Sequence, residues 1–206
     1  MKQISIATNN SKLGAIPNTS LLPGRDCLNF KNCISKCYAV PIVKQYKNTK
    51  LAWSNNGKVL RDNPESYFRS FFDRKRVLPG MYRIHVSGDF ISQSHVNGWI
   101  DIARDYPSVK FMAFTKSYAL NFDNRPDNLE IIFSVFPDTK LAESKNNSGE
   151  LYTSKIADDD NNWHKIPHDI RLAWLDNGKE SRMPDNTFNC PAVKDKTIKC
   201  ADCKTC

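Results

Sequence analysis

Several features that would assign a function class directly are missing from this 206-residue sequence. No apolar run approaches the ~18 residues of a spanning helix, and the first thirty residues hold no basic-then-apolar leader pattern. Internal repeats and low-complexity linkers are also absent, which argues against a repeat or linker architecture. No Ser-His-Asp arrangement, catalytic carboxylate pair or phosphate-cradling glycine loop can be argued from spacing. We therefore expect a cytoplasmic globular protein with no membrane partner.

Cysteine is missing from the whole interval between Cys37 and Cys190. Thiols stay reduced in the cytoplasm, and an odd number of cysteines cannot close a full set of disulfides. Clustered thiolates repel one another unless a cation lies between them, so this distribution predicts metal binding. The seven cysteines lie near the two ends of the chain, at Cys27, Cys33, Cys37, Cys190, Cys200, Cys203 and Cys206.

The late cysteines can supply a complete set of four metal ligands. Cys200, Cys203 and Cys206 are separated by gaps of two residues, which is typical of ferredoxin-like iron–sulfur ligation, and Cys190 supplies a fourth thiolate. Zinc sites usually pair two such gaps across a longer loop, so zinc is the alternative metal. We expect residues 189–206 to form a cysteine-rich metal-binding tail.

The early cysteines offer only three thiolates. Cys27, Cys33 and Cys37 are separated by five and three residues. A [4Fe–4S] cluster held by three cysteines leaves one iron open to a substrate or cofactor. One cluster on three cysteines and a second on four would use every cysteine in the chain. In the competing arrangement, one shared site takes four ligands from both ends, leaves three thiols over and is mainly structural.

The middle of the chain has the most regular pattern of apolar residues. A strand followed by a helix and a further strand predicts a parallel sheet with a right-handed crossover. The expected strands cover 81–87, 109–114, 129–136 and 171–175, and the expected helices cover about 38–46, about 92–104 and a segment starting at Asn63-Pro64. The polar stretch 137–166 predicts a loop or small insertion.

Three motifs occur in a characteristic order. They are Cys33-x3-Cys37-Tyr38-Ala39, then Val86-Ser87-Gly88-Asp89-Phe90, then Phe114-Thr115-Lys116-Ser117, which a further strand follows. In this order, and over roughly Leu13 to Cys206, the sequence resembles the phage gene product 88 family. That family is itself similar to radical S-adenosylmethionine (SAM) proteins, whose own cysteine gaps are three and two residues.

The resemblance implies an α/β fold, namely a partial, open (β/α) barrel of radical-SAM-like type over residues 1–188, with the cysteine-rich tail packed on it. It also implies a [4Fe–4S] cluster at the C-terminal mouth of the strands, bound by Cys27, Cys33 and Cys37. The free iron would bind the amino and carboxylate groups of SAM. The residues expected around SAM are Tyr38, Ser87, Gly88, Asp89 and Lys116.

Three polar residues near this mouth allow more than one interpretation. His85 could contact a ligand or be a hydrogen-bonded core histidine. Asp89 could be a site residue or only the start signal of the next helix. Lys116, at the end of its strand, could pair with a carboxylate or a phosphate.

Charge is distributed unevenly along the chain. Residues 41–83 carry ten basic and three acidic side chains, whereas residues 84–189 carry 11 basic and 16 acidic ones. The basic segment could present a face to nucleic acid, or it could be an ordinary solvated helical surface.

Two functions follow as hypotheses. The first is a radical-SAM-like oxidoreductase or modifying enzyme with one or two [4Fe–4S] clusters, an electron donor and an unknown substrate. The alternative is a nucleic-acid-binding or interaction protein whose cysteines hold a purely structural metal.

Overall fold

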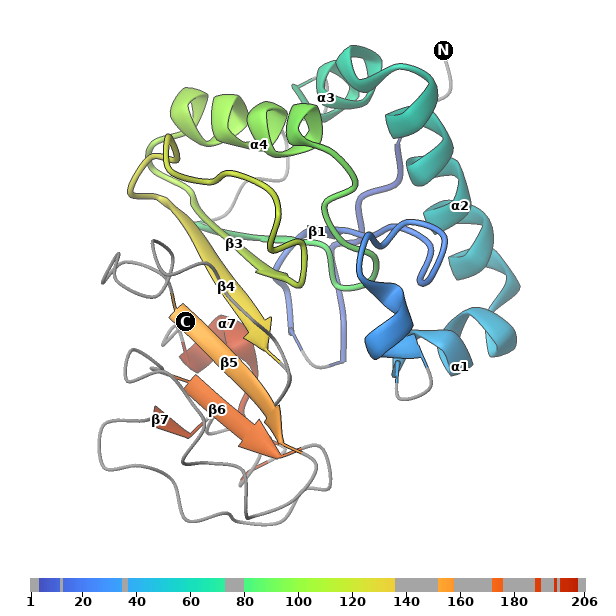
Figure 1. Ribbon diagram of the computed structural model, residues 1–206, viewed down its shortest axis with the longest axis vertical. Coiled ribbons are helices and arrows are strands. Elements are labelled where there is room, and N and C mark those ends of the chain that lie inside the picture. The colour runs from blue at the N-terminus through green and yellow to red at the C-terminus, as the bar shows by residue number, and fades with distance from the viewer. Residues whose placement is uncertain are drawn as a thin grey trace.

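The computed structural model describes residues 4–11, 13–34, 37–72, 80–135, 152–157, 172–175, 188–189, 195 and 197–203. Its strands lie side by side in chain order from β1 to β7, and each neighbouring pair is parallel. Helices α1 to α4 form an arc along the outer side of the first strands (Figure 1). This is a mixed α/β fold with a parallel sheet, as the sequence predicted.

The strands are short and the helices are of unequal length. The first four strands are β1 (Asn18–Thr19), β2 (Met81–Ile84), β3 (Lys110–Thr115) and β4 (Leu129–Val135). Pairing continues through β5 (Tyr152–Ala157), β6 (Leu172–Leu175) and β7 (Phe188–Asn189). The helices are α1 (Ala39–Gln45), α2 (Lys47–Asp62), α3 (Pro64–Phe72), α4 (Gln93–Asp105) and α7 (Cys200–Cys203), and a 3₁₀ turn covers Phe30–Asn32.

The predicted strand–helix–strand unit is confirmed in β2, α4 and β3. Helix α4 begins after Ser92, whose hydroxyl accepts a hydrogen bond from the His95 backbone N–H at 3.2 Å. Helix α3 begins in the same way, because the Asn63 side chain accepts from the Ser66 N–H at 2.8 Å. Pro64 then occupies the first helical position, where a missing N–H costs nothing.

An aromatic cluster forms the core between the helices and the sheet. Trp99 of α4 lies fully buried between Phe71 of α3 and Tyr82 of β2, with ring centroids 5.3 Å and 5.7 Å away. Phe111 of β3 extends the cluster. Such rings contribute their buried area plus about 0.5–1.5 kcal/mol for each favourable pair. The aromatic stripe of α3 is therefore core rather than a surface platform.

Besides the short elements β1, β7, α7 and the 3₁₀ turn, two longer elements differ from the sequence-based expectation. Helix α2 was not predicted, because Asn55-Asn56-Gly57 resembles a turn. Strand β5 falls inside 137–166, so the loop prediction is wrong over 152–157. There the parallel pairing of Tyr152 with Ile132 of β4 supplies a partner that the local polarity does not reveal.

The short helix α7 lies against the N-terminal part of the chain. The Ala201 N–H donates to the Leu13 carbonyl at 3.2 Å. A Cβ added to Gly14 would lie 3.3 Å from the Ala201 Cβ, so the two segments are in close contact. Within the described part of the chain, no helix combines the length and the apolar character needed to cross a membrane.

Candidate metal centre

Three chain segments meet at the carboxyl edge of the sheet. The cysteine loop follows β1, Ser87-Gly88-Asp89 follows β2, and Lys116 follows β3 directly. Because these strands are parallel and adjacent, their carboxyl ends lie at the same edge. The sequence-predicted residues from these segments are thus brought together.

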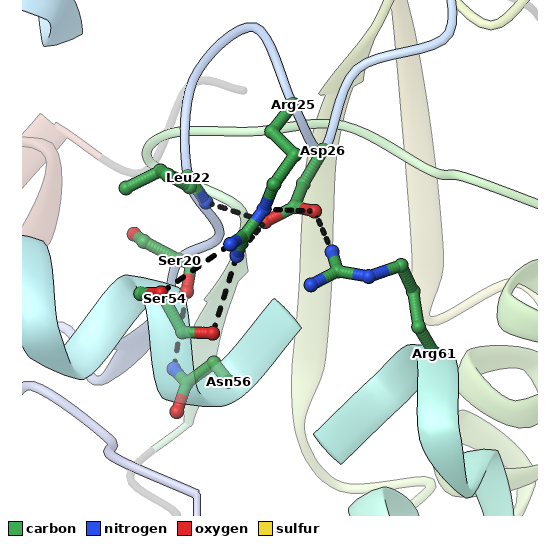
Figure 2. A network of polar contacts seen from close by, with 7 residues as sticks. All are labelled: Ser20, Leu22, Arg25, Asp26, Ser54, Asn56 and Arg61. Carbon is green, nitrogen blue, oxygen red and sulfur yellow. Dashed lines mark hydrogen bonds and ion pairs between the residues drawn. The ribbon is translucent and has the colours of Figure 1, made fainter. Parts of the chain in front are cut away.

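Asp26, immediately before Cys27, ties the cysteine loop to helix α2. Its carboxylate is fully buried and accepts hydrogen bonds from the Leu22 N–H at 3.0 Å and from Arg25 at 3.2 Å. Arg61 of α2 also donates to it, as Figure 2 shows. A Cβ at Gly57 would lie 2.2 Å from Oδ2 of Asp26, so only glycine leaves room for the carboxylate on α2.

The same network fixes the chain just before Asp26 (Figure 2). Asn56 of α2 donates to the Ser20 carbonyl at 3.0 Å, and Arg25 donates to the Ser54 carbonyl at 3.2 Å. Asn56 is fully buried, so these amide hydrogen bonds satisfy a group that would otherwise be costly to bury. The start of the cysteine loop is therefore fixed to α2 at several points.

Asp89 joins the loops that follow β2 and β3. Its carboxylate accepts from the Thr115 hydroxyl at 2.6 Å, the Lys116 N–H at 2.8 Å and the Phe90 N–H at 2.7 Å. Its own N–H donates to the Asp26 carbonyl at 2.9 Å. Burial raises the pKa of Asp89, and the hydrogen bond from Thr115 opposes that rise. Asp89 thus holds the loops after β2 and β3 together. Three hydrogen bonds already occupy most of the acceptor positions of its carboxylate.

Two side chains of the cysteine loop reach across to the strand ends. The Asn29 amide donates to the Lys116 carbonyl, and the Tyr38 hydroxyl donates to the Val86 carbonyl. The ring of Tyr38 nevertheless remains 62% exposed. These bonds place the loop directly over the ends of β2 and β3.

Gly88 allows the close approach of β1 and the loop after β2. Its φ of +81° lies in the left-handed region, and an added Cβ would lie 2.5 Å from the Leu21 Cβ. The Leu21 N–H donates to the Ser87 carbonyl at 2.8 Å. The glycine of the Ser-Gly-Asp motif is therefore required by the backbone.

The three early cysteines share one electrostatic environment. Burial, with smaller contributions from Asp89, Cys33 and Cys37, raises the pKa of Cys27 to about 12, although a hydrogen bond with the Gly24 backbone opposes the rise. Burial also raises the pKa of Cys33, whereas the nearby Lys116 ammonium lowers it. Such thiols become thiolates when a cation takes the place of the proton.

The spacing of these thiols bears on the kind of metal. Among the residues that the structure describes, no three Cys, His, Asp or Glu side chains are placed to hold a single ion. A tetrahedral zinc site needs thiolates about 4 Å apart, since each Zn–S bond is about 2.3 Å long. In a cubane each cysteine binds a different iron, so its thiolates stay farther apart. The choice between an iron–sulfur cluster and zinc stays a prediction.

Two polar groups beneath the site have no hydrogen-bond partner in the described part of the chain. They are the Ser87 hydroxyl and the two ring nitrogens of His85, and both side chains are buried. His85 also has a left-handed backbone conformation, with φ +54°. Its ring packs on Phe90 and His95, with centroid distances of 5.0 Å and 4.9 Å. His85 is therefore a core histidine, but one without the hydrogen bond that such residues usually make.

The tail site can be followed only in part. Cys203 is half-buried in α7, and Cys200 begins that helix. Cys190 and Cys206 lie outside the described residues, as does half of the 189–206 segment. The choice between one shared site and two separate sites therefore stays a prediction.

Sequence reasoning missed the residues that hold the loop in place. Asp26 and Arg61 are far apart in the chain, and no spacing rule joins them. The only available signal was an acidic residue directly before Cys27 within an otherwise basic region. Asn29 likewise resembled an ordinary turn residue.

Taken together, the fold and the site define an α/β protein with a parallel sheet and a cysteine-rich loop held over its carboxyl edge. The gene product 88 family matches residues 2–206, so the chain belongs to this family. It is 29% identical over 197 residues to the Gene 88 protein of Mycobacterium phage L5, covering 84% of this chain and 74% of that protein. It is 27% identical over 146 residues to the Gene 88 protein of Mycobacterium phage D29, covering 55% and 60%. No solved structure matches the chain.

Proposed function

We propose that Cys27, Cys33 and Cys37 bind a [4Fe–4S] cluster and that the protein is a radical-SAM-like enzyme with a partial (β/α) barrel. The observation that carries this proposal is the meeting of three thiols with Asp89 and Lys116 at the carboxyl edge of a parallel sheet. Such an edge is where α/β proteins bind their ligands. Parallel strands that follow one another in chain order also occur in (β/α) barrels, which supports this part of the proposal.

The residues present suit a cluster with one open iron. Bound there by three thiolates, a [4Fe–4S] cluster would supply one-electron reduction and an open coordination position for SAM. Ser87 would offer its unpartnered hydroxyl to the ligand, and Lys116 would offer a cation for the SAM carboxylate. Asp89 would hold the two loops at a fixed separation through its hydrogen bonds to Thr115 and Lys116. An electron donor would complete the system.

The decisive experiment is anaerobic purification with iron and sulfide quantification and visible spectroscopy. A brown protein containing iron and sulfide in equal amounts is the expected result, with zinc absent. Reduction in the presence of SAM should then release methionine and 5′-deoxyadenosine. A colourless protein with stoichiometric zinc would overturn the proposal and favour a structural metal.

Matched cysteine variants separate one site from two. Cys37→Ala should abolish SAM cleavage and remove the early cluster, while a cluster on the tail cysteines remains. Cys203→Ala should remove only the tail cluster. If either single variant loses all of the iron, one shared site joins the two ends of the chain.

A further inference from the structure

The exposed large apolar side chains of the described residues all come from one stretch of the chain. Within the described residues, the large hydrophobic side chains that are exposed are Leu28, Phe30, Ile34, Tyr38, Tyr46 and Leu51. All six come from the cysteine loop, α1 and the start of α2. Scattered exposed hydrophobics are ordinary, but their restriction to one stretch of 24 residues marks an interaction surface.

The same stretch carries positive charge only. Residues 27–61 contain six lysines and one arginine and no acidic residue. Lys31, Lys44, Lys47 and Lys50 are exposed there. In the described part of the chain no salt bridge joins these four to a carboxylate. Their charge is therefore available to a partner.

Not every cation of the basic segment 41–83 is available to a partner. Lys58 pairs with Asp62, Arg61 pairs with Asp26 and Arg69 pairs with Glu65, so these three cations of the described residues each have a carboxylate partner. Arg83 stacks on the Phe114 ring, with its guanidinium carbon 4.1 Å from the ring centroid. Among the described residues, cations for which the structure shows no ion pair lie at the cysteine loop, α1 and the first turns of α2.

Helix geometry places Lys47 and Lys50 on the exposed face of α2, and Tyr46 directly precedes that helix. In α2, Lys47, Lys50 and Leu51 lie on the face opposite the buried Asn56 and Leu60. Tyr46 joins α1 to α2 in an extended conformation and is 53% exposed. Figure 1 shows α1 and this end of α2 at the periphery, away from β5 to β7. We call Lys31, Tyr38, Lys44, Tyr46, Lys47 and Lys50 the basic–aromatic surface.

We infer that the basic–aromatic surface binds single-stranded nucleic acid. Lysines neutralise backbone phosphates, and exposed tyrosine rings stack on unpaired bases, which a duplex does not offer. The surface begins at Cys37-Tyr38, so a strand lying on it would pass beside the three early cysteines. This inference concerns the partner of the surface and does not depend on the proposed cluster chemistry.

Two other partners fit less well. An acidic protein would use the lysines but gives no reason for exposed tyrosines beside them. An anionic membrane would need a continuous apolar face on the helix, whereas the exposed face of α2 alternates Lys47, Lys50 and Leu51 with the ion pair of Lys58 and Asp62. The experiment below can detect binding to either an acidic polymer or an anionic membrane.

The experiment measures the binding of a labelled 20-nucleotide single strand to the full chain by fluorescence anisotropy at several salt concentrations. Four lysine–phosphate contacts predict a slope of about −3 in log K against log salt, or about a 50-fold loss between 50 and 200 mM. Lys44→Gln/Lys47→Gln/Lys50→Gln should reduce the slope by about 2. Lys58→Gln/Arg69→Gln/Arg104→Gln removes the same charge from paired, exposed positions and should bind like the unmodified protein.

A second pair of variants tests stacking. Tyr46→Ser should weaken binding about tenfold, whereas Tyr46→Phe keeps the ring and should bind normally. The inference is overturned if the two lysine variants lose equal affinity, or if the single strand does not bind. It is also overturned if heparin, a duplex or phosphatidylglycerol vesicles bind as tightly as the strand and Tyr46→Ser has no effect.

Discussion

The buried pair His85 and His95 should make the protein sensitive to mild acid. Burial, with a smaller contribution from Arg83, lowers the pKa of His85 to about 3. Burial also lowers the pKa of His95 well below its usual value, and His85 adds to that effect. Nε2 of His95 accepts a hydrogen bond from the Trp99 indole N–H at 3.2 Å. If that nitrogen took up a proton, its N–H would face the Trp99 N–H, and two hydrogen-bond donors would meet with no acceptor between them.

The magnitude follows from linkage. The pKa of histidine is about 6.5 in an unfolded chain, so below that pH the unfolded state takes up protons that the native state excludes. The free energy of unfolding is unaffected above pH 6.5 and falls as the pH drops toward the native pKa of about 3. Between pH 7 and pH 5 the loss from His85 alone is about 2 kcal/mol. His95 adds to the loss in the same direction.

Urea denaturation at pH 7 and pH 5, on the unmodified protein and on His85→Leu, is the appropriate assay. Both proteins share every carboxylate and His95, so the difference between their pH responses reports His85 together with its coupling to His95. The variant should lose about 2 kcal/mol less than the unmodified protein between the two pH values. Identical pH responses would refute the reasoning, because they would mean that His85 already takes up its proton in the folded protein.

Two further predictions concern the frame around the cysteine loop, both measured by urea denaturation at pH 7. Asp26→Asn should lower the free energy of unfolding by about 3 kcal/mol, because it leaves buried donors poorly satisfied. Asp62→Asn, in an exposed ion pair, is its control and should have little effect. Gly88→Ala should cost about 2–4 kcal/mol through backbone strain and overlap with Leu21. Gly80→Ala, with nothing within 4 Å of the added Cβ, should be nearly neutral.

The central part of the fold could be predicted from sequence because its signals are local. In β2 the alternation of Tyr82 and Ile84 reports the buried face directly, and Ser92 marks the start of α4. The parallel arrangement then follows from the order of strands and helix. The carboxyl-edge position of Ser87 and Lys116 follows in turn, since each comes just after a strand.

The missed elements depend on partners distant in sequence. Asn56 and Gly57 resemble a turn, yet both belong to the middle of α2. Asn56 is needed for its hydrogen bonds to Ser5 and Ser20, and Gly57 leaves room for the Asp26 carboxylate. Both residues have low helix propensity, and for glycine this costs about 1 kcal/mol relative to alanine. The tertiary contacts of the two residues compensate for that cost. No local pattern could reveal that compensation.

The cysteine loop is held by contacts that need no metal. Asp26 fixes its start to α2, Asn29 fixes its middle to β3, and Tyr38 fixes its end to β2. In a clasp whose only purpose is to join two ends of a chain, metal binding itself provides the order, and such loops are unfolded without it. A loop that is already positioned over the carboxyl edge of a sheet does not need a metal for that purpose. This supports the proposal that the three thiols belong to a preorganised site, which the iron and zinc quantification tests.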